Sequence, residues 1–210
     1  MKRRNSYWNE FYEHNPVTEE PSTFAKFSLP YINTINTLIE LGCGNGRDSV
    51  YFARNGINVV ALDLSVKAIE INLKRKMVNI EFLNWDFTNS PSQIVKSRAI
   101  GSIYSRFTMH SIDKFSFEKT ISWVANSLPV GSKFFIEART INDALYGVGT
   151  PLNDNAFETS HYRRFLDIKD VKSRLEKLHF KFLYCVEDYV SAEYKNDGAV
   201  VLRMICEKEQ

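Results

Sequence analysis

Three glycines at alternate positions, Gly42, Gly44 and Gly46, are the part of this sequence best suited to binding a ligand. They follow an apolar segment that predicts a strand and precede residues 47–55, which predict a helix. A strand that delivers glycines to the start of a helix lets a ligand lie directly against the backbone. An acid, Asp63, ends the next apolar run, at the position where an open α/β fold binds a ribose hydroxyl. The combination predicts a site for a cofactor that contains a nucleoside.

The spacing of the glycines separates one class of cofactor from another. Nicotinamide and flavin enzymes use Gly-x-Gly-x-x-Gly, whose third glycine lets the helix pack closely on the strand. In this chain that position is Arg47, and the pattern is instead Glu40 followed by Gly-x-Gly-x-Gly from position 42. The segment resembles motif I of the class I S-adenosylmethionine (SAM) methyltransferases. The resemblance implies SAM as the cofactor and S-adenosylhomocysteine as the product formed from it.

The same resemblance implies roles for the residues around the glycines. Glu40 and the glycines would frame the methionine part of SAM, and Asp63 would bind the ribose hydroxyls. Asp86 follows the third predicted strand and would accept a hydrogen bond from the adenine amino group, with Trp85 or Phe87 packed on the ring. The residues implied to line the cofactor are Tyr12, Glu40, Gly42, Cys43, Gly44, Gly46, Asp48, Asp63, Leu64, Asp86, Phe87 and Ser105.

Three of these residues also have simpler explanations. Asp86 precedes Ser90 and Pro91, and taken alone would form a turn or cap a helix as readily as it would bind adenine. Because motif I lies upstream, we favour the adenine interpretation. Cys43 is more simply a small residue tolerated in a glycine-rich turn than a nucleophile. Asp48 would either order the turn or reach the amino-acid part of SAM through water.

The composition limits the classes of protein. The 210 residues include 27 Lys and Arg against 25 Asp and Glu, so the basic excess typical of nucleic-acid binding is missing. No apolar run approaches the roughly 20 residues of a membrane span, and no signal-peptide core follows the basic N-terminus. The three cysteines have neither disulfide nor zinc spacing. We expect a cytoplasmic enzyme for a small molecule, without metal, membrane or nucleic acid; the sequence carries no sign of an oligomeric state.

Alternating apolar and amphipathic segments predict the fold class. Strands are expected at 37–41, 58–62, 79–83, 100–105, 133–139, 180–187 and 199–207, and helices at 46–55, 65–76, 91–97, 115–127 and 168–178. This order implies right-handed crossovers and a parallel sheet, while the last two strands, with no helix between them, form an antiparallel hairpin. The prediction is an α/β, Rossmann-like three-layer sandwich with a seven-stranded sheet, as in class I methyltransferases. We assign residues 36–210 to this domain and 1–35 to an N-terminal helical cap over the cofactor site.

Four aromatic residues near the N-terminus, Tyr7, Trp8, Phe11 and Tyr12, have helical spacing. In the simpler interpretation, Trp8 and Phe11 pack on an edge of the sheet. In the other interpretation, Tyr7 or Tyr12 closes over the bound cofactor, as N-terminal segments do in related small-molecule methyltransferases. We favour the second interpretation.

Residues 104–111 end the fourth predicted strand, where methyltransferases carry motif IV near the reactive methyl group. Asn-Pro-Pro-Tyr, the signature of enzymes that methylate DNA bases or protein glutamine, is absent from this position. His110 is a candidate general base because the pKa of an unperturbed histidine lies near neutrality. The alternative is that His110 lines the cofactor pocket or caps the next helix.

A long, irregular segment is expected after the fifth strand, from about residue 142 to 165. Loops of this length are usually functional, and this one starts at the carboxyl end of the sheet, so we interpret it as a substrate lid. His161 within it is the second candidate base. Arginines on the same rim favour an anionic substrate, although Arg163 and Arg164 would also fit an exposed basic pair. The residues predicted to bind the substrate are Arg106, Arg139, Tyr146, Tyr162, Arg163 and Arg164.

The resemblance extends over nearly the whole chain. Gly-Cys-Gly-Asn-Gly-Arg-Asp with the later Val-Val-Ala-Leu-Asp resembles the thiopurine and tellurite-resistance branch of methyltransferases, and 8–12, 105–112 and 161–165 resemble small bacterial enzymes of surface-polysaccharide biosynthesis. It implies methyl transfer to an oxygen or nitrogen of a small metabolite bearing phosphate or carboxylate. The alternatives are an NAD(P)-dependent oxidoreductase, which Arg47 and the terminal hairpin argue against, and a SAM-binding module without catalysis.

Overall fold

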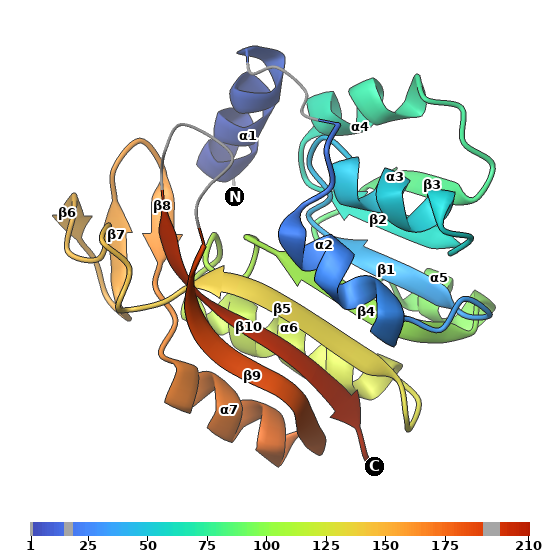
Figure 1. Cartoon of the computed structure of the whole chain (residues 1–210). Helices are drawn as coiled ribbons and strands as arrows, with labels where there is room; N and C mark the ends of the chain where they lie inside the picture. Colours follow the sequence, from blue (N-terminus) through green and yellow to red (C-terminus); the bar gives the residue numbers. More distant parts are fainter. Residues whose placement is uncertain (1, 15–18, 191–197) are drawn as a thin grey trace.

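The computed structural model describes residues 2–14, 19–190 and 198–210. Its centre is a seven-stranded sheet with the strand order β3-β2-β1-β4-β5-β10-β9 (Figure 1). Strands β1 to β5 are parallel, and β10 is antiparallel to both β5 and β9. The strands are β1 (Thr37–Leu41), β2 (Val59–Asp63), β3 (Ile80–Asn84), β4 (Ile100–Arg106), β5 (Lys133–Arg139), β9 (Phe180–Val190) and β10 (Ala199–Lys208). The predicted α/β fold, a mostly parallel sheet with a C-terminal antiparallel hairpin, is confirmed.

Helices cover both faces of this sheet, so its strands are buried on two sides and are apolar along most of their length. On one face, Phe52 packs in a core with Tyr104 and Phe135; on the other, Phe117 packs with Phe134. The first face is covered by α2 (Thr23–Ser28), α3 (Arg47–Arg54) and α4 (Val66–Leu73), and the second by α5 (Ser92–Ser97), α6 (Lys114–Ser127) and α7 (Ile168–Lys177).

Polar side chains set where several helices begin. The side chains of Ser22, Ser65, Asp113 and Asp167 each accept a backbone N–H from the first turn of α2, α4, α6 and α7, respectively. Helix α4 ends at Leu73, earlier than predicted, and the chain turns at Lys76, whose φ is 49°.

The segment predicted to be irregular contains a small antiparallel sheet, β6 (Thr150–Pro151), β7 (Ala156–Glu158) and β8 (Tyr162–Arg164). Asp154 and Asn155, with φ of 61° and 59°, turn the chain between β6 and β7, a geometry that Asp and Asn tolerate. The ring of Tyr146 packs edge-on against Phe157 and Phe165, and its hydroxyl donates to Asn155 over 3.2 Å. Tyr146, predicted to bind substrate, therefore supports this sheet.

Helix α1 (Lys2–His14) lies over the carboxyl end of the large sheet, between the small sheet and α4 (Figure 1). Asn9 accepts the hydroxyl of Ser65 over 2.7 Å on the α4 side, and Tyr7 stacks on His161 on the other side. Helix α2, by contrast, is part of the main core, where Phe24 is fully buried. The division into a cap and a domain at residue 35 remains a prediction. None of the described helices is both long and apolar enough to cross a membrane.

Candidate active site

The turn between β1 and α3 follows a backbone path that few residues adopt. Gly42, Gly44 and Gly46 have φ angles of 72°, 54° and 74°, in the left-handed region that a side chain disfavours. The amides of Gly42 and Cys43 donate to the carbonyl of Leu62 over 2.7 and 2.9 Å, which ties the turn to β2. The backbone path therefore requires the glycines before any ligand is considered.

Each of the three glycines also faces a side chain that leaves no room for a Cβ. The colliding partners would be Thr108 at Gly42, the Tyr12 hydroxyl at Gly44, and Asn72 at Gly46. Asn72 donates its Nδ2 to the carbonyl of Gly44 over 2.7 Å and so holds the turn from α4. Tyr12 belongs to α1, so the N-terminal helix reaches the centre of the glycine turn.

Asp63, at the carboxyl end of β2, faces the same turn. Its two oxygens accept the backbone N–H groups of Gly44 and Ser65, both over 2.8 Å. Burial raises the pKa of this carboxyl, and the two backbone hydrogen bonds act in the opposite direction. A carboxylate has about four lone pairs, so one that accepts two N–H groups can still accept hydroxyls from a ligand.

Two further acids lie under the turn. Glu40 is buried in β1 and accepts the hydroxyl of Ser49; burial and, next, the charge of Asp48 raise the pKa of Glu40 to about 8. Asp48 accepts the N–H and hydroxyl of Ser22 over 2.8 and 2.7 Å, and the hydroxyl of Tyr104 over 3.0 Å. These contacts join α3 to the start of α2 and to β4, which gives Asp48 a structural task.

Other residues predicted for the cofactor lie at the ends of β2, β3 and β4. Asp86 accepts the N–H and hydroxyl of Thr88 over 3.0 and 2.8 Å, the contacts of a local turn. Phe87 is buried beside the glycine turn, Ser105 is fully buried in β4, and Leu64 is half-buried after β2. The structure thus brings these residues to one end of the sheet.

Cys43 is buried in the glycine turn, and burial raises the pKa of its thiol. A buried thiol with a raised pKa is a packing residue, because the reactive form of cysteine is the thiolate. Within residues 2–14, 19–190 and 198–210, no three His, Cys, Asp or Glu side chains gather as metal ligands.

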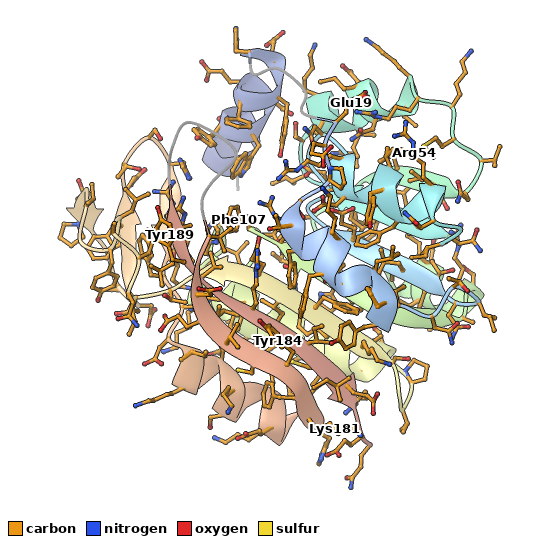
Figure 2. The ribbon with its side chains drawn as sticks, viewed as in Figure 1. Glu19, Arg54, Phe107, Lys181, Tyr184 and Tyr189 are labelled. Atoms are coloured by element: carbon orange, nitrogen blue, oxygen red, sulfur yellow. The ribbon has the colours of Figure 1, made fainter. Side chains whose placement is uncertain are left out.

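Arginines gather where β4 and β5 end. Phe107 directly follows β4, has a φ of 56°, and lies at the carboxyl end of the sheet below α1 (Figure 2). The guanidinium carbon of Arg106 lies 4.4 Å from the centre of the Phe107 ring, and that of Arg139 lies 5.8 Å from it. A left-handed conformation is uncommon for phenylalanine, and such residues are concentrated at functional sites.

Buried carboxylates fix both of these arginines. Arg139 donates to the two oxygens of Asp143 over 2.9 and 2.8 Å, and the Nε of Arg106 lies 2.9 Å from Oε1 of Glu137. Glu137 is fully buried in β5 and also accepts from Arg203 of β10 over 2.6 Å. The positive charges are therefore held in place by the sheet.

His110 lies among these arginines. Its Nδ1 accepts the backbone N–H of Arg139 over 3.2 Å, and its ring centre is 5.4 Å from that of Phe107. Burial, followed by the charges of Arg139 and Arg163, lowers the pKa of His110 well below its usual value. The ring is neutral near pH 7.

His161, just before β8, connects the small sheet to α1. Its ring stacks on Tyr7 with the centres 4.6 Å apart, and Trp8 lies 5.7 Å away. Its Nε2 accepts from Arg163 over 3.0 Å, and its Nδ1 is 3.1 Å from the hydroxyl of Ser160. Burial and the charge of Arg163 lower the pKa of His161 to about 4.

The predicted convergence of all the arginines on one rim is wrong in one case. Side chains alternate along a strand, so Tyr162 and Arg164 share the face of β8 opposite to Arg163. Arg164 is buried, donates to the carbonyl of Ile112 over 3.2 Å, and lies over the ring of Phe117. Arg164 therefore anchors the small sheet, whereas Arg163 faces His161.

Comparison with known proteins decides the family. Residues 11–184 match the model of a family described as a methyltransferase domain. This chain belongs to the methyltransferase-domain family. The predicted enzyme class, a SAM-dependent methyltransferase, is confirmed, while the branch within the class remains a prediction. No curated protein sequence matches the methyltransferase significantly.

Solved structures share its fold. A SAM-dependent methyltransferase from Methanosarcina mazei gives a TM-score of 0.74 at 15% identity, over 90% of this chain and 99% of the other. One from Anabaena variabilis gives 0.73 at 19% identity, over 98% and 93%. The 1,6-didemethyltoxoflavin-N1-methyltransferase of Burkholderia thailandensis, solved with 1,6-didemethyltoxoflavin and S-adenosylhomocysteine, gives 0.62 at 14%, over 90% and 79%. At these identities the likeness supports the fold alone.

Sequence reasoning missed several residues of the methyltransferase site. Asn9, Asn72 and Thr108 hold α1 and the glycine turn, yet no local pattern marks them. Asp143 pairs with Arg139 in the turn after β5, where no helical spacing marks the pair in the sequence. Phe107 carries no signal because its conformation appears only in the folded chain.

Proposed function

We propose that this methyltransferase moves the SAM methyl group to an oxygen or nitrogen of a small metabolite that bears a carboxylate or phosphate. The observation that carries the proposal is the opposite charge of two neighbouring regions. Asp63 supplies the negative charge of what we call the cofactor half, which also contains the glycine turn and Glu40, whose carboxyl is protonated near neutral pH. Arg106, Arg139 and Arg163, with the two histidines among them, form the acceptor half. A cationic cofactor suits the first half, and an anionic acceptor suits the second.

The residues of the cofactor half fit SAM. Gly44 has no side chain and lies directly under the Tyr12 hydroxyl, and Asp63 retains lone pairs that suit ribose hydroxyls. We assign the methionine part to the glycine turn, and the adenine to the end of β3 at Asp86 and Phe87. When bound, SAM supplies a methyl group that its sulfonium makes electrophilic.

The chain itself contributes alignment and exclusion of water. Helix α1 is held over the site from both sides, by Asn9 on Ser65 and by Tyr7 on His161. Tyr12 reaches Gly44 from the same helix, which supports its assignment to the cofactor site. Alignment of reacting groups alone lowers a barrier by about 7–11 kcal/mol.

Two alternative functions, an oxidoreductase and a SAM-binding module without catalysis, can be weighed against the same observations. A family match to a methyltransferase domain does not favour an NAD(P)-dependent oxidoreductase. A SAM-binding module without catalysis would share the cofactor half, so turnover has to separate it from an enzyme. A role in surface-polysaccharide biosynthesis and a cytoplasmic location remain predictions.

Calorimetric titration with SAM and S-adenosylhomocysteine tests the cofactor assignment. We expect micromolar binding by the wild type, no binding of NADH, and at least about a 100-fold loss in Asp63→Ala, about 2.7 kcal/mol. Arg54→Ala, at an exposed position of α3 (Figure 2), is the control and should bind normally. Binding of NADH instead of SAM would overturn the proposal, and transfer of radiolabelled methyl to carboxylates or phosphates separates an enzyme from a silent module.

A further inference from the structure

Hydrogen bonds show which ring nitrogen carries the proton in each of the two histidines of the acceptor half, His110 and His161. A backbone N–H can only donate, so Nδ1 of His110, which accepts from Arg139, is unprotonated and the single proton of the neutral ring is on Nε2. A guanidinium also only donates, so Nε2 of His161, which accepts from Arg163, is unprotonated and its proton is on Nδ1. His161 thereby uses both nitrogens within the small sheet, since Nδ1 faces Ser160.

Burial and charged side chains from several elements keep the ring of His110 neutral. Arg139 approaches from β5, His161 and Arg163 from the small sheet, and Arg164 from the same strand as Arg163, and each lowers the pKa of His110. A second proton on this ring would add a positive charge to a group of fixed positive charges. His110 is thus a poor acceptor of a proton at either nitrogen.

What His110 does offer is one N–H. No residue in the described ranges accepts a hydrogen bond from its Nε2. The centre of the His110 ring lies 5.4 Å from that of Phe107, which directly follows β4 and lies below α1 (Figure 2). The acceptor half therefore presents N–H donors and positive charge around a ring that cannot remove a proton.

We propose that the accepting atom is itself an oxyanion oxygen, of a carboxylate or phosphate, and that Nε2–H of His110 orients it, so that no side chain acts as a general base. This inference rests on the proposed function. An oxygen lone pair forms the new O–CH₃ bond, the S–CH₃ bond breaks with its electrons left on sulfur, and the negative and positive charges cancel. No proton is taken up or released, so no base is required. A hydroxyl or amine acceptor would instead have to lose a proton to some group.

The test is nitrogen-15 NMR of the enzyme labelled at its four histidines, saturated with S-adenosylhomocysteine. His110 is identified by the signal missing in His110→Gln or, should that variant fail to fold, by elimination with His14→Gln, His161→Gln and His179→Asn. We expect the proton of His110 on Nε2 and no titration between about pH 8 and 5.5, since an ordinary histidine titrates near about 6.5. A proton on Nδ1, or titration near the ordinary pKa, would overturn the proposal.

Small probes then test the oxyanion. Acetate and inorganic phosphate stand for the two sources, and methanol is the neutral control. We expect one or both anions, but not methanol, to shift the Nε2–H signal of His110. The anion that binds more tightly indicates whether the accepting oxygen belongs to a carboxylate or to a phosphate. His110→Ala should weaken that anion at least about tenfold, about 1.4 kcal/mol, with His110→Gln, which keeps an N–H, weakened less. His14→Gln, at the exposed end of α1, is the matched control.

Two failures are distinguishable in these experiments. If neither anion moves the His110 signal while S-adenosylhomocysteine binds, the inference is wrong and the proposed cofactor stands. If S-adenosylhomocysteine does not bind, the proposed function itself fails.

Discussion

The cofactor half and the acceptor half are built in opposite ways. The cofactor half relies on backbone: three left-handed glycines, and Asp63 accepting two backbone N–H groups. The acceptor half relies on side chains, with Arg139 held by Asp143, and Arg106 held by Glu137. Added side chains should therefore disrupt the glycine turn of the cofactor half, whereas the acceptor half should be disrupted only when a side chain is removed.

Removal of Asp143 should have the largest effect. Asp143 is fully buried, pairs with Arg139, and also accepts the N–H of Val200 over 2.9 Å. Asp143→Ala leaves a buried guanidinium uncompensated, so we expect the free energy of unfolding in urea to fall by about 3–5 kcal/mol. Glu118→Gln breaks the more exposed pair with Arg174 and should cost less than about 1 kcal/mol. Equal losses would show that burial of the Asp143 carboxylate does not set the stability of the acceptor half.

The second-largest effect should come from adding one methyl group at Gly44, which should strongly weaken SAM binding. Gly44→Ala must place a Cβ at a φ of 54° against the Tyr12 hydroxyl, so we expect SAM affinity to fall at least about 100-fold, about 2.7 kcal/mol, by calorimetry. Gly56→Ala is the control, because its φ is 82° but its surroundings are open. Backbone strain there costs about 1–2 kcal/mol of stability without touching the site. Similar SAM affinities in both variants would show that the close approach at Gly44 has no role.

Two adjacent arginines of β8 should affect different properties, because Arg163 belongs to the acceptor half and Arg164 anchors the small sheet. Arg163→Met should raise the Michaelis constant for an anionic acceptor about tenfold, about 1.4 kcal/mol, because it removes a positive charge beside His161. Arg164→Met should instead lower stability by about 1–3 kcal/mol, because the buried carbonyl of Ile112 loses its donor. Steady-state kinetics and urea unfolding of both variants check this, and the reverse assignment would refute the orientation of β8.

The smallest effect should be a pH dependence that belongs to Glu40. Its pKa is raised to about 8 in the folded protein, so between pH 6.5 and 8 the carboxyl is ionised in the unfolded chain but protonated in the folded one. Unfolding then releases a proton, and stability falls as pH rises, by at most about 1.4 kcal/mol per pH unit for one group. Both site histidines are neutral in this window. Glu40→Gln should flatten the slope; an unchanged slope would place Glu40 in its ordinary range.

The two halves also differ in how well the sequence predicts them. The cofactor half lies within one short stretch, so the glycine spacing and the acid after the second strand predict it from local pattern. The acceptor half draws on β4, β5 and β8, whose side-chain directions depend on register. Arg163 and Arg164 are both predicted from the sequence to bind the substrate, yet they face opposite sides of a strand that the sequence did not suggest. The small sheet was missed because Asp154 and Asn155 turn the chain without the glycine that usually marks such a hairpin.

Because β10 lies between β5 and β9, the C-terminal part of the sheet can pair only after β10 has been made. Strand β9 pairs only with β10 within the described part of the sheet, so it has no neighbour until β10 is in place. Arg203 of β10 reaches Glu137 only after that pairing, whereas β1, β2 and the glycine turn need no residue beyond β4 to form their own ladder. Until β10 is available, β9 therefore remains an unpaired 11-residue edge, the kind of edge that invites aggregation. We expect the yield of folded protein to depend on how soon residues 199–208 become available to pair with residues 180–190.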